Sequence, residues 1–164
     1  MDEAEFNAVL EAHSGMLGRI AASYEAEFSA REDLLQDIAV AVWRALPKWR
    51  SDGSLRSFVA RIAHNRCVTH ILNERRHNHA EAVEEVLVDH GADPQRDAVN
   101  CQRHERLQGA LRRLPLGQRQ VVTLALEGFS HVEIADTLDI KPNTVDVRIS
   151  RARRTLADYL EEGA

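Results

Sequence analysis

The chain has 164 residues, enough for one or two small domains, and only 5% of it is aromatic although 44% is hydrophobic, so aliphatic cores are expected. No apolar run approaches membrane-spanning length, and the start MDEAEF is acidic where a secretory signal would be basic; this predicts a cytoplasmic protein without a membrane partner. The net charge of −5 predicts weak, salt-sensitive DNA binding by the isolated chain, although clustered arginines leave local basic faces.

The N-terminal part of the chain is predicted to be helical. Apolar residues at helical spacing indicate one helix over residues 3–23 and a second over residues 30–46, which Pro47 ends. Ser29 is followed three residues later by Glu32, the capping-box pattern, so Ser29 is expected to cap the second helix. An acidic, partly apolar surface outside its buried stripe is formed by Asp33, Gln36, Asp37 and Val40. The alternative for these residues is an ordinary solvated helix face.

A polar loop over residues 48–54 contains Trp49 and leads into a helix over residues 55–76, for which Ser54 is a suitable cap. Polar side chains opposite the apolar stripe of this helix are those of Arg56, Arg61, Asn65 and Arg66. A tryptophan beside arginines is typical of a platform for single-stranded nucleic acid, where rings stack on bases and guanidinium groups hold phosphates. The alternative, a core tryptophan with solvated arginines, fits the composition equally well.

A change in composition separates the two halves of the chain. Residues 79–100 are acidic, contain a glycine and a proline, and lack sustained periodicity, so they are predicted to form a flexible linker with one helical turn around residues 81–87. The expected fold class is all-α, with two small helical domains over residues 1–78 and 101–164 joined by this linker.

The C-terminal domain is predicted to end in a helix-turn-helix. Helices over residues 101–114 and 118–127 precede it, Ser130 is expected to cap its short first helix, and Asn143 is expected to cap its second. The second helix buries Val145, Ile149, Ala152 and Leu156 and exposes Thr144, Val147, Arg148, Ser150 and Arg151. An apolar back and an arginine-bearing front are typical of a DNA-recognition helix. The alternative is a helical hairpin with solvated arginines.

No constellation for catalysis is apparent, since the sequence offers no Ser/His/Asp set, no glycine-rich phosphate loop and no paired carboxylates; neither enzymatic activity nor a cofactor is expected. His64, Cys67 and His70 recur every three residues, but this spacing fans too widely around one helix for a tetrahedral ion, and no metal site is predicted. Cys67 and Cys101 lie far apart without a CxxC pattern, which fits a reducing compartment.

Two stretches resemble a known family. DLLQDIAVAVWRAL, followed by KWRSDGSLRSFVARIAHNR, resembles the region of bacterial RNA polymerase sigma factors that binds the polymerase clamp and opens promoter DNA. LRRLPLGQRQVVTLALEGFSHVEIADTLDIKPNTVDVRISRARRTL resembles their C-terminal promoter-reading region. The order and spacing are similar to those of the small extracytoplasmic-function (ECF) class of the sigma-70 family. The resemblance implies a factor that binds core RNA polymerase and directs promoter-specific initiation.

The resemblance also implies three groups of contact residues. Contacts to the coiled coil of the polymerase β′ subunit are implied for Asp33, Leu34, Gln36, Asp37 and Ile38. Contacts to the −10 promoter element are implied for Trp49, Arg50, Ser51, Asp52, Ser54, Phe58, Arg61, Asn65 and Arg66. Contacts to the −35 element are implied for Asn143, Thr144, Val147, Arg148, Arg151 and Arg154.

The implied partners are core RNA polymerase, through its β and β′ subunits, and promoter DNA. An anti-sigma factor is compatible with these partners, although the sequence shows no receptor for it. Neither domain needs to bind DNA tightly, because the polymerase holds both near one promoter and raises their effective concentration. The alternative function is a stand-alone helix-turn-helix regulator that acts without polymerase. The segment from Trp49 to Asn65, which a repressor would not need, discriminates between the two.

Two aspartates depart from the family's pattern. Asp139 stands in the turn where the family usually has glycine, and aspartate adopts a left-handed conformation less readily than glycine does. Asp146 stands where the family often has lysine or arginine. Either Asp146 favours the helix dipole and completes a cap with Asn143, or it alters promoter choice by repelling phosphate or accepting from a cytosine amino group.

Overall fold

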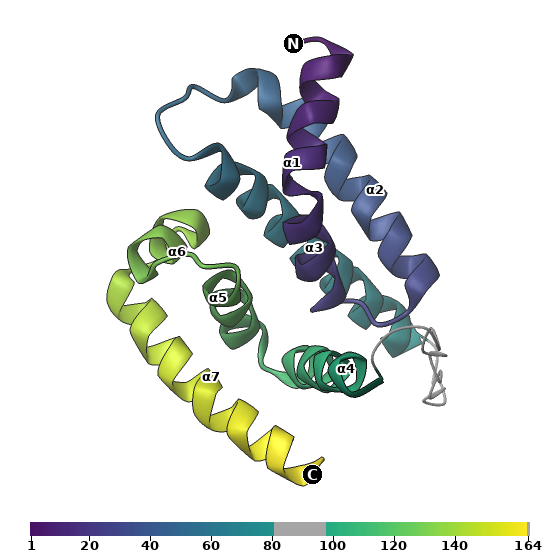
Figure 1. Cartoon of the computed structure of the whole chain (residues 1–164), viewed down its shortest axis with the longest axis vertical. Coiled ribbons are helices and arrows are strands. Elements are labelled where there is room, and N and C mark those ends of the chain that lie inside the picture. Colours follow the sequence, from purple (N-terminus) through teal and green to yellow (C-terminus); the bar gives the residue numbers. More distant parts are fainter. Residues whose placement is uncertain (81–97, 164) are drawn as a thin grey trace.

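The computed structural model describes residues 1–80 and 98–163, and this part of the chain is helical, without a β-strand (Figure 1). Its elements are α1 (Glu3–Ala22), α2 (Phe28–Ala45), the short 3-10 helix η1 (Leu46–Lys48), α3 (Leu55–Ala80), α4 (Ala98–Arg113), α5 (Leu116–Leu126), α6 (His131–Leu138) and α7 (Pro142–Glu162). The predicted all-α fold is confirmed. Among the described residues, no helix combines the length and the apolar character needed to cross a lipid bilayer.

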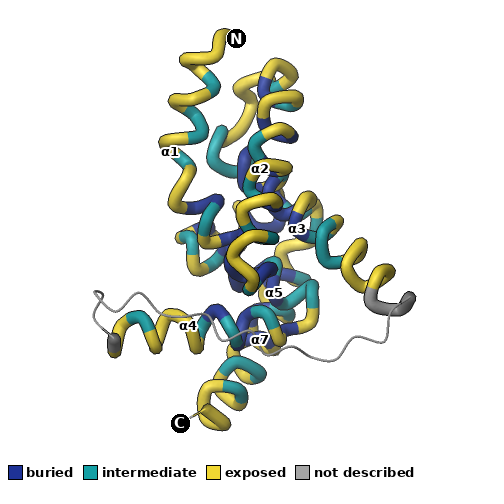
Figure 2. The backbone as a smooth tube through the Cα atoms, turned by 90° about the vertical axis from the view of Figure 1, so that its right-hand side faces the viewer, coloured by how far each residue is buried: buried dark blue, intermediate teal, exposed yellow. Residues whose placement is uncertain are grey.

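Helices α1, α2 and α3 pack together as the N-terminal unit. Each hides one apolar stripe against the other two, and the buried side chains include Leu17, Ile20, Leu34, Ile38, Val42, Val59 and Ala63. Ile20, Ile38 and Val59 have no exposed surface. Figure 2 shows that the N-terminal half of α1 is mostly exposed, whereas the buried residues of this helix lie in its C-terminal half. The core is aliphatic, as the composition predicts.

Helices α4 to α7 form the C-terminal unit, in which α7 contacts each of the other three. Its buried side chains include Leu111, Leu114, Val121, Leu124, Ile134, Val145, Ile149 and Ala152. The inward face predicted for α7 is confirmed, since Val145, Ile149 and Ala152 are buried and Leu156 is half-buried at its edge.

Two predicted helix caps are wrong. Helix α2 begins at Phe28 because the Glu27 carboxylate accepts from the free backbone N–H groups of Ser29 (3.0 Å) and Ala30 (2.5 Å), which places Ser29 inside the helix. Helix α7 begins at Pro142, whose fixed φ and missing N–H suit a first helical position, so that Asn143 also lies inside the helix.

The turn of the helix-turn-helix is built as expected. Ser130 caps α6: its Oγ accepts from the Glu133 backbone N–H, and the Glu133 carboxylate accepts from the Ser130 backbone N–H, both at 3.2 Å. Asp139 ends α6 in the left-handed conformation, with φ 55° and ψ 50°. An aspartate therefore occupies a position whose left-handed backbone conformation costs less free energy with glycine.

The predicted boundaries differ from the observed ones in the middle of the chain. Helix α3 continues to Ala80, and α4 already begins at Ala98, inside the predicted linker. The helical turn predicted around residues 81–87 lies outside the described residues. Helix α5 begins at Leu116, directly after Pro115, rather than at Gln118.

The two units dock through the connection between α5 and α6 and through α4 and α5, from which Arg112 donates to the Ala22 carbonyl at 2.8 Å and Thr123 donates to Ser23 Oγ at 3.4 Å. Arg19 of α1 donates two hydrogen bonds to the Glu127 carboxylate, Nε to Oε1 at 2.6 Å and Nη2 to Oε2 at 2.9 Å. Arg56, at the start of α3, donates to the Glu127 backbone carbonyl and lies over the Phe129 ring, 4.4 Å from its centroid. Phe129 is only 4% exposed. This docking places α6 against α3 (Figure 1).

Candidate nucleic-acid interface

The sequence left open whether Trp49 is an exposed stacking platform or a core residue, and its burial is intermediate between the two. It follows η1, is half-buried, and packs on Phe58 of α3, with ring centroids 6.4 Å apart and planes inclined by 41°. Phe58 is also half-buried. Because each ring keeps part of its surface free, the pair forms an aromatic wall rather than a core plug.

That wall belongs to a pocket of about 360 Å³. The N-terminal unit lines it with Trp49, Asp52, Gly53, Ser54, Ser57, Phe58 and Arg61, and α6 lines it with Glu133, Asp136 and Thr137. Five residues predicted to contact the −10 element therefore converge here. The wall from α6 was not predicted, because it comes from the other unit and only docking brings it to the loop.

The other residues predicted to contact the −10 element lie elsewhere. Asn65 and Arg66 line a separate hollow of about 290 Å³ between α2 and α3, together with Ala41, Ala45, Ile62 and Thr69. Arg50 and Ser51 are exposed on the loop, where Ser51 has a left-handed backbone with φ 59°. The structure thus divides the predicted set between a pocket, a hollow and the loop surface.

The residues predicted to bind polymerase divide into exposed and buried groups. Asp33, Gln36 and Asp37 are exposed on α2. Leu34 and Ile38 are one turn apart on its inner face, with 2% and 0% of their surface exposed, and they pack in the core of the N-terminal unit. Their burial leaves them a role in holding α2 in place.

Helix α2 also exposes apolar side chains beside the acidic ones. Val40 is 48% exposed and Trp43 is 43% exposed, and the Trp43 ring meets Phe6 of α1 edge-on with centroids 4.8 Å apart. At 100° per residue, both fall on the same side of α2 as Asp33 and Gln36. Trp43 was missed from the sequence, although its helical position relative to Gln36 was a usable signal.

The α7 face carries all six residues predicted to contact the −35 element. Asn143, Val147, Arg151 and Arg154 are exposed, and Thr144 and Arg148 are half-buried. The Arg148 guanidinium lies against Gly117 at the start of α5, where a Cβ would come within 3.2 Å of its Cζ. A glycine thus leaves room for the arginine.

Asp146 does not form the predicted cap with Asn143. Its Oδ1 lies 2.5 Å from Nδ1 of His131, which is in the first turn of α6, so the pair joins the two helices of the helix-turn-helix. Both side chains are about half exposed. The carboxylate remains beside the α7 face that is predicted to contact DNA and also lies at the positive end of the α6 dipole.

His64, Cys67 and His70 do not converge. His64 and Cys67 are buried in the core, and His64 Nδ1 lies 3.1 Å from the Tyr24 hydroxyl oxygen. Burial lowers the pKa of His64 to about 4 and raises the pKa of Cys67 to about 12, so both are neutral at pH 7. His70 faces Glu25 instead.

Comparison with known protein families identifies both units. The family model of sigma-70 region 2 matches residues 9–77, and the model of sigma-70 region 4 matches residues 104–156. These ranges cover most of the N-terminal and the C-terminal unit, respectively. The chain belongs to the sigma-70 family of transcription initiation factors, which are not enzymes.

Individual relatives show to which class of sigma-70 factors the chain belongs. The chain is 28% identical to the RNA polymerase sigma factor NccH of Alcaligenes xylosoxydans xylosoxydans, over 98% of this chain and 89% of NccH. It is 29% identical to the ECF RNA polymerase sigma factor SigM of Mycobacterium tuberculosis, over 97% of this chain and 79% of SigM. The protein is an ECF sigma factor and directs transcription initiation by core RNA polymerase.

Two solved structures share the fold. CnrH, solved in complex with the cytosolic domain of CnrY, has a TM-score of 0.73 and 25% identity, over 99% of this chain and 92% of CnrH. The sigma factor RpoE of Bartonella quintana, solved with the anti-sigma factor NepR, has a TM-score of 0.74 and 23% identity, over 97% of this chain and 96% of RpoE.

Proposed function

We propose that three surfaces of this chain divide the work of initiation. The exposed face of α2, with Asp33, Gln36 and Asp37, binds the polymerase β′ subunit, and residues 1–78 form the unit that binds polymerase and the −10 element. Residues 101–164 form the unit that reads the −35 element, and residues 79–100 connect the two. The main support for the proposal is that one chain combines the aromatic pocket at Trp49 with the arginine-bearing helix α7.

The pocket suits an unpaired base. Trp49 and Phe58 offer aromatic surfaces on which a base can stack, and Arg61 supplies a cation for the backbone phosphate. Ser54 and Asp52 add polar atoms that can read the base edge. Capturing a base outside the duplex supplies part of the energy that melting requires and makes that energy depend on the base.

Helix α7 suits a major groove. Thr144 and Val147 can contact base edges, and Arg148, Arg151 and Arg154 can bind bases or phosphates. The chain is acidic overall, so this contact is expected to be weak without polymerase. Polymerase compensates by holding both DNA-binding units over one promoter.

The docked arrangement is incompatible with this use of the pocket. Glu133 and Asp136 of α6 stand opposite Trp49, where they would repel a DNA phosphate. Hydrogen bonding to the side chain and backbone of Ser130 lowers the pKa of Glu133, which keeps its charge at neutral pH. Base capture therefore requires α6 to move away from the pocket when each unit binds its own part of polymerase.

An anti-sigma factor belongs to the same proposal as a third partner. CnrH was solved with the cytosolic domain of CnrY and RpoE with the anti-sigma factor NepR, and both share the fold of this chain. The proposal places the chain in the cytoplasm, where the polymerase works, and leaves all bond-forming chemistry to the polymerase.

Run-off transcription with bacterial core polymerase, using a library of duplex and pre-melted promoters, tests the proposal. Template-specific initiation should depend on the chain and should fall strongly in Asp37→Arg, which reverses a charge on the exposed face of α2. Glu11→Arg makes the same charge change at an exposed position of α1 and should retain activity. If the chain bound duplex DNA alone and never stimulated polymerase, the function would instead be that of a stand-alone regulator.

A further inference from the structure

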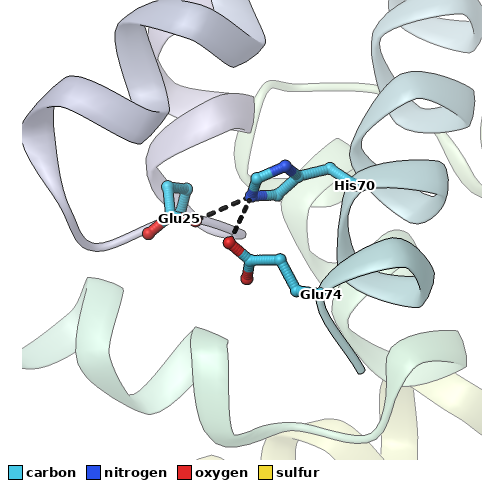
Figure 3. A group of neighbouring side chains, drawn as sticks. All are labelled: Glu25, His70 and Glu74. Atoms are coloured by element: carbon cyan, nitrogen blue, oxygen red, sulfur yellow. Dashed lines mark hydrogen bonds and ion pairs between the residues drawn. The ribbon is translucent and has the colours of Figure 1, made fainter. Parts of the chain in front are cut away.

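Three side chains outside the proposed DNA and polymerase surfaces converge on one point of the N-terminal unit (Figure 3). His70 Nε2 lies 2.7 Å from Glu25 Oε2 and 3.3 Å from Glu74 Oε1, and the three ligand atoms lie within 4.8 Å of one another. His70 and Glu74 are one turn apart on α3, whereas Glu25 comes from the connection between α1 and α2. The fold, rather than proximity in sequence, brings the third ligand to the other two.

Two carboxylates in this cluster face one imidazole nitrogen. One imidazole Nε2 holds at most one proton, but two carboxylates compete for it. A cation that touches both carboxylates would remove this competition.

We propose that Glu25, His70 and Glu74 bind a divalent transition-metal ion, for which Zn²⁺ is the best match. One imidazole nitrogen and two carboxylate oxygens are ligands that Zn²⁺ accepts, whereas Mg²⁺ and Ca²⁺ prefer oxygen alone. Tetrahedral bonds of about 2.0–2.1 Å place ligand atoms roughly 3.3 Å apart. The distance from His70 to Glu74 already has this value, and the distance from His70 to Glu25 must widen by about 0.6 Å.

The surroundings favour such a site. The second carboxylate oxygen of Glu25, Oε1, accepts from the backbone N–H of Glu27 at 2.9 Å, which orients Oε2 toward His70. The side chains of Glu25 and His70 are 11% and 21% exposed, whereas that of Glu74 is 48% exposed. An ion can therefore enter from the side of Glu74 and keep water as a fourth ligand. Once bound, it would tie the connection between α1 and α2 to α3.

Calorimetric titration of the metal-free full chain with Zn²⁺ tests the site. We expect saturable binding of one ion per chain. His70→Gln and Glu74→Gln should each weaken binding by more than about tenfold. Circular dichroism reports whether each variant folds. Because Glu74 is half exposed, Glu74→Gln is expected to fold, and it tests the site even if His70→Gln does not fold.

His104→Gln is the matched control, because it removes an exposed imidazole from α4 and should leave the affinity unchanged. A tenfold excess of Mg²⁺ should not displace Zn²⁺. The absence of saturable Zn²⁺ binding, or wild-type affinity in a folded Glu74→Gln variant, would overturn the proposal and leave the cluster as an ion pair only. Neither outcome bears on the polymerase and promoter contacts proposed above, which the transcription assay tests separately.

Discussion

Substitution Arg19→Ala is expected to open the docked arrangement of the free chain. Arg19 donates both side-chain hydrogen bonds that the Glu127 carboxylate accepts across the interface. The Glu127 side chain is only 7% exposed, so its charge would stay shielded from water if the units remained docked without the arginine. Neither residue lines the aromatic pocket, so the variant keeps the walls that the N-terminal unit supplies and loses only those from α6 when it undocks.

The exposure of Arg19 sets how much the Arg19–Glu127 pair contributes to docking. Hydrogen bonds to charged groups contribute about 1.5–3 kcal/mol, and exposed ion pairs about 0.2–1 kcal/mol. The Arg19 side chain is 55% exposed, so solvent screening places this pair between the two ranges, at about 1.4 kcal/mol. That energy corresponds to roughly a tenfold increase in the ratio of undocked to docked chains.

Fluorescence anisotropy of the free chain with a labelled single-stranded −10 oligonucleotide measures this shift. We proposed that only the undocked form accepts a base, and on that proposal the apparent affinity should rise by up to roughly tenfold in Arg19→Ala. Arg113→Ala is the matched control, because it removes another arginine–glutamate pair, Arg113–Glu162 at 3.2 Å, inside the C-terminal unit. An unchanged affinity in Arg19→Ala, or an equal gain in the control, would refute the inhibitory role of docking.

Three further predictions concern single residues. Gly117→Ala must displace the guanidinium of Arg148 and should weaken binding to a −35 duplex by about threefold to tenfold, whereas Gly109→Ala, which meets no atom within 4 Å, should not. The pKa of His64 is lowered to about 4 in the folded chain, so the unfolded chain binds a proton at this imidazole first as the pH falls from about 6.5 to 4. The free energy of unfolding should therefore drop by about 3 kcal/mol over this pH range. Denaturant titrations of His64→Gln should lack this pH-dependent loss. Asp146→Arg should tighten non-specific duplex binding and steepen its salt dependence; an unchanged affinity and salt slope would contradict this.

The sequence was sufficient to predict features that depend only on residues close together in the chain, such as buried helix faces and caps. The apolar periodicity of α7 identified Val145, Ile149 and Ala152 as buried, because a helix must hide one stripe wherever it packs. Ser130 was identified as a cap because its hydroxyl and the Glu133 carboxylate satisfy free backbone groups three residues away. Asp139 stands where the family usually has glycine, and it takes the left-handed conformation, which needs no partner outside the turn.

The misplaced caps show where local signals compete. Ser29 has the capping pattern, yet Glu27 reaches the same free N–H groups from two residues earlier and starts the helix sooner. Asn143 is a good cap by type, yet Pro142 suits the first helical position and moves the start of α7 forward. Family resemblance has a related limit: it marked Leu34 together with the exposed residues of α2, although Leu34 is in the core.

The sequence by itself determined the helices and the class of protein, because periodicity, capping and family motifs depend on residues that are close together in the chain. Only the tertiary structure decided which residues meet across the chain. It placed Glu133 opposite Trp49, joined Arg19 to Glu127, and brought Glu25 to His70. These contacts depend on how α6 packs on α3 and how the connection after α1 turns, and long-range packing of this kind leaves no local pattern in a single sequence.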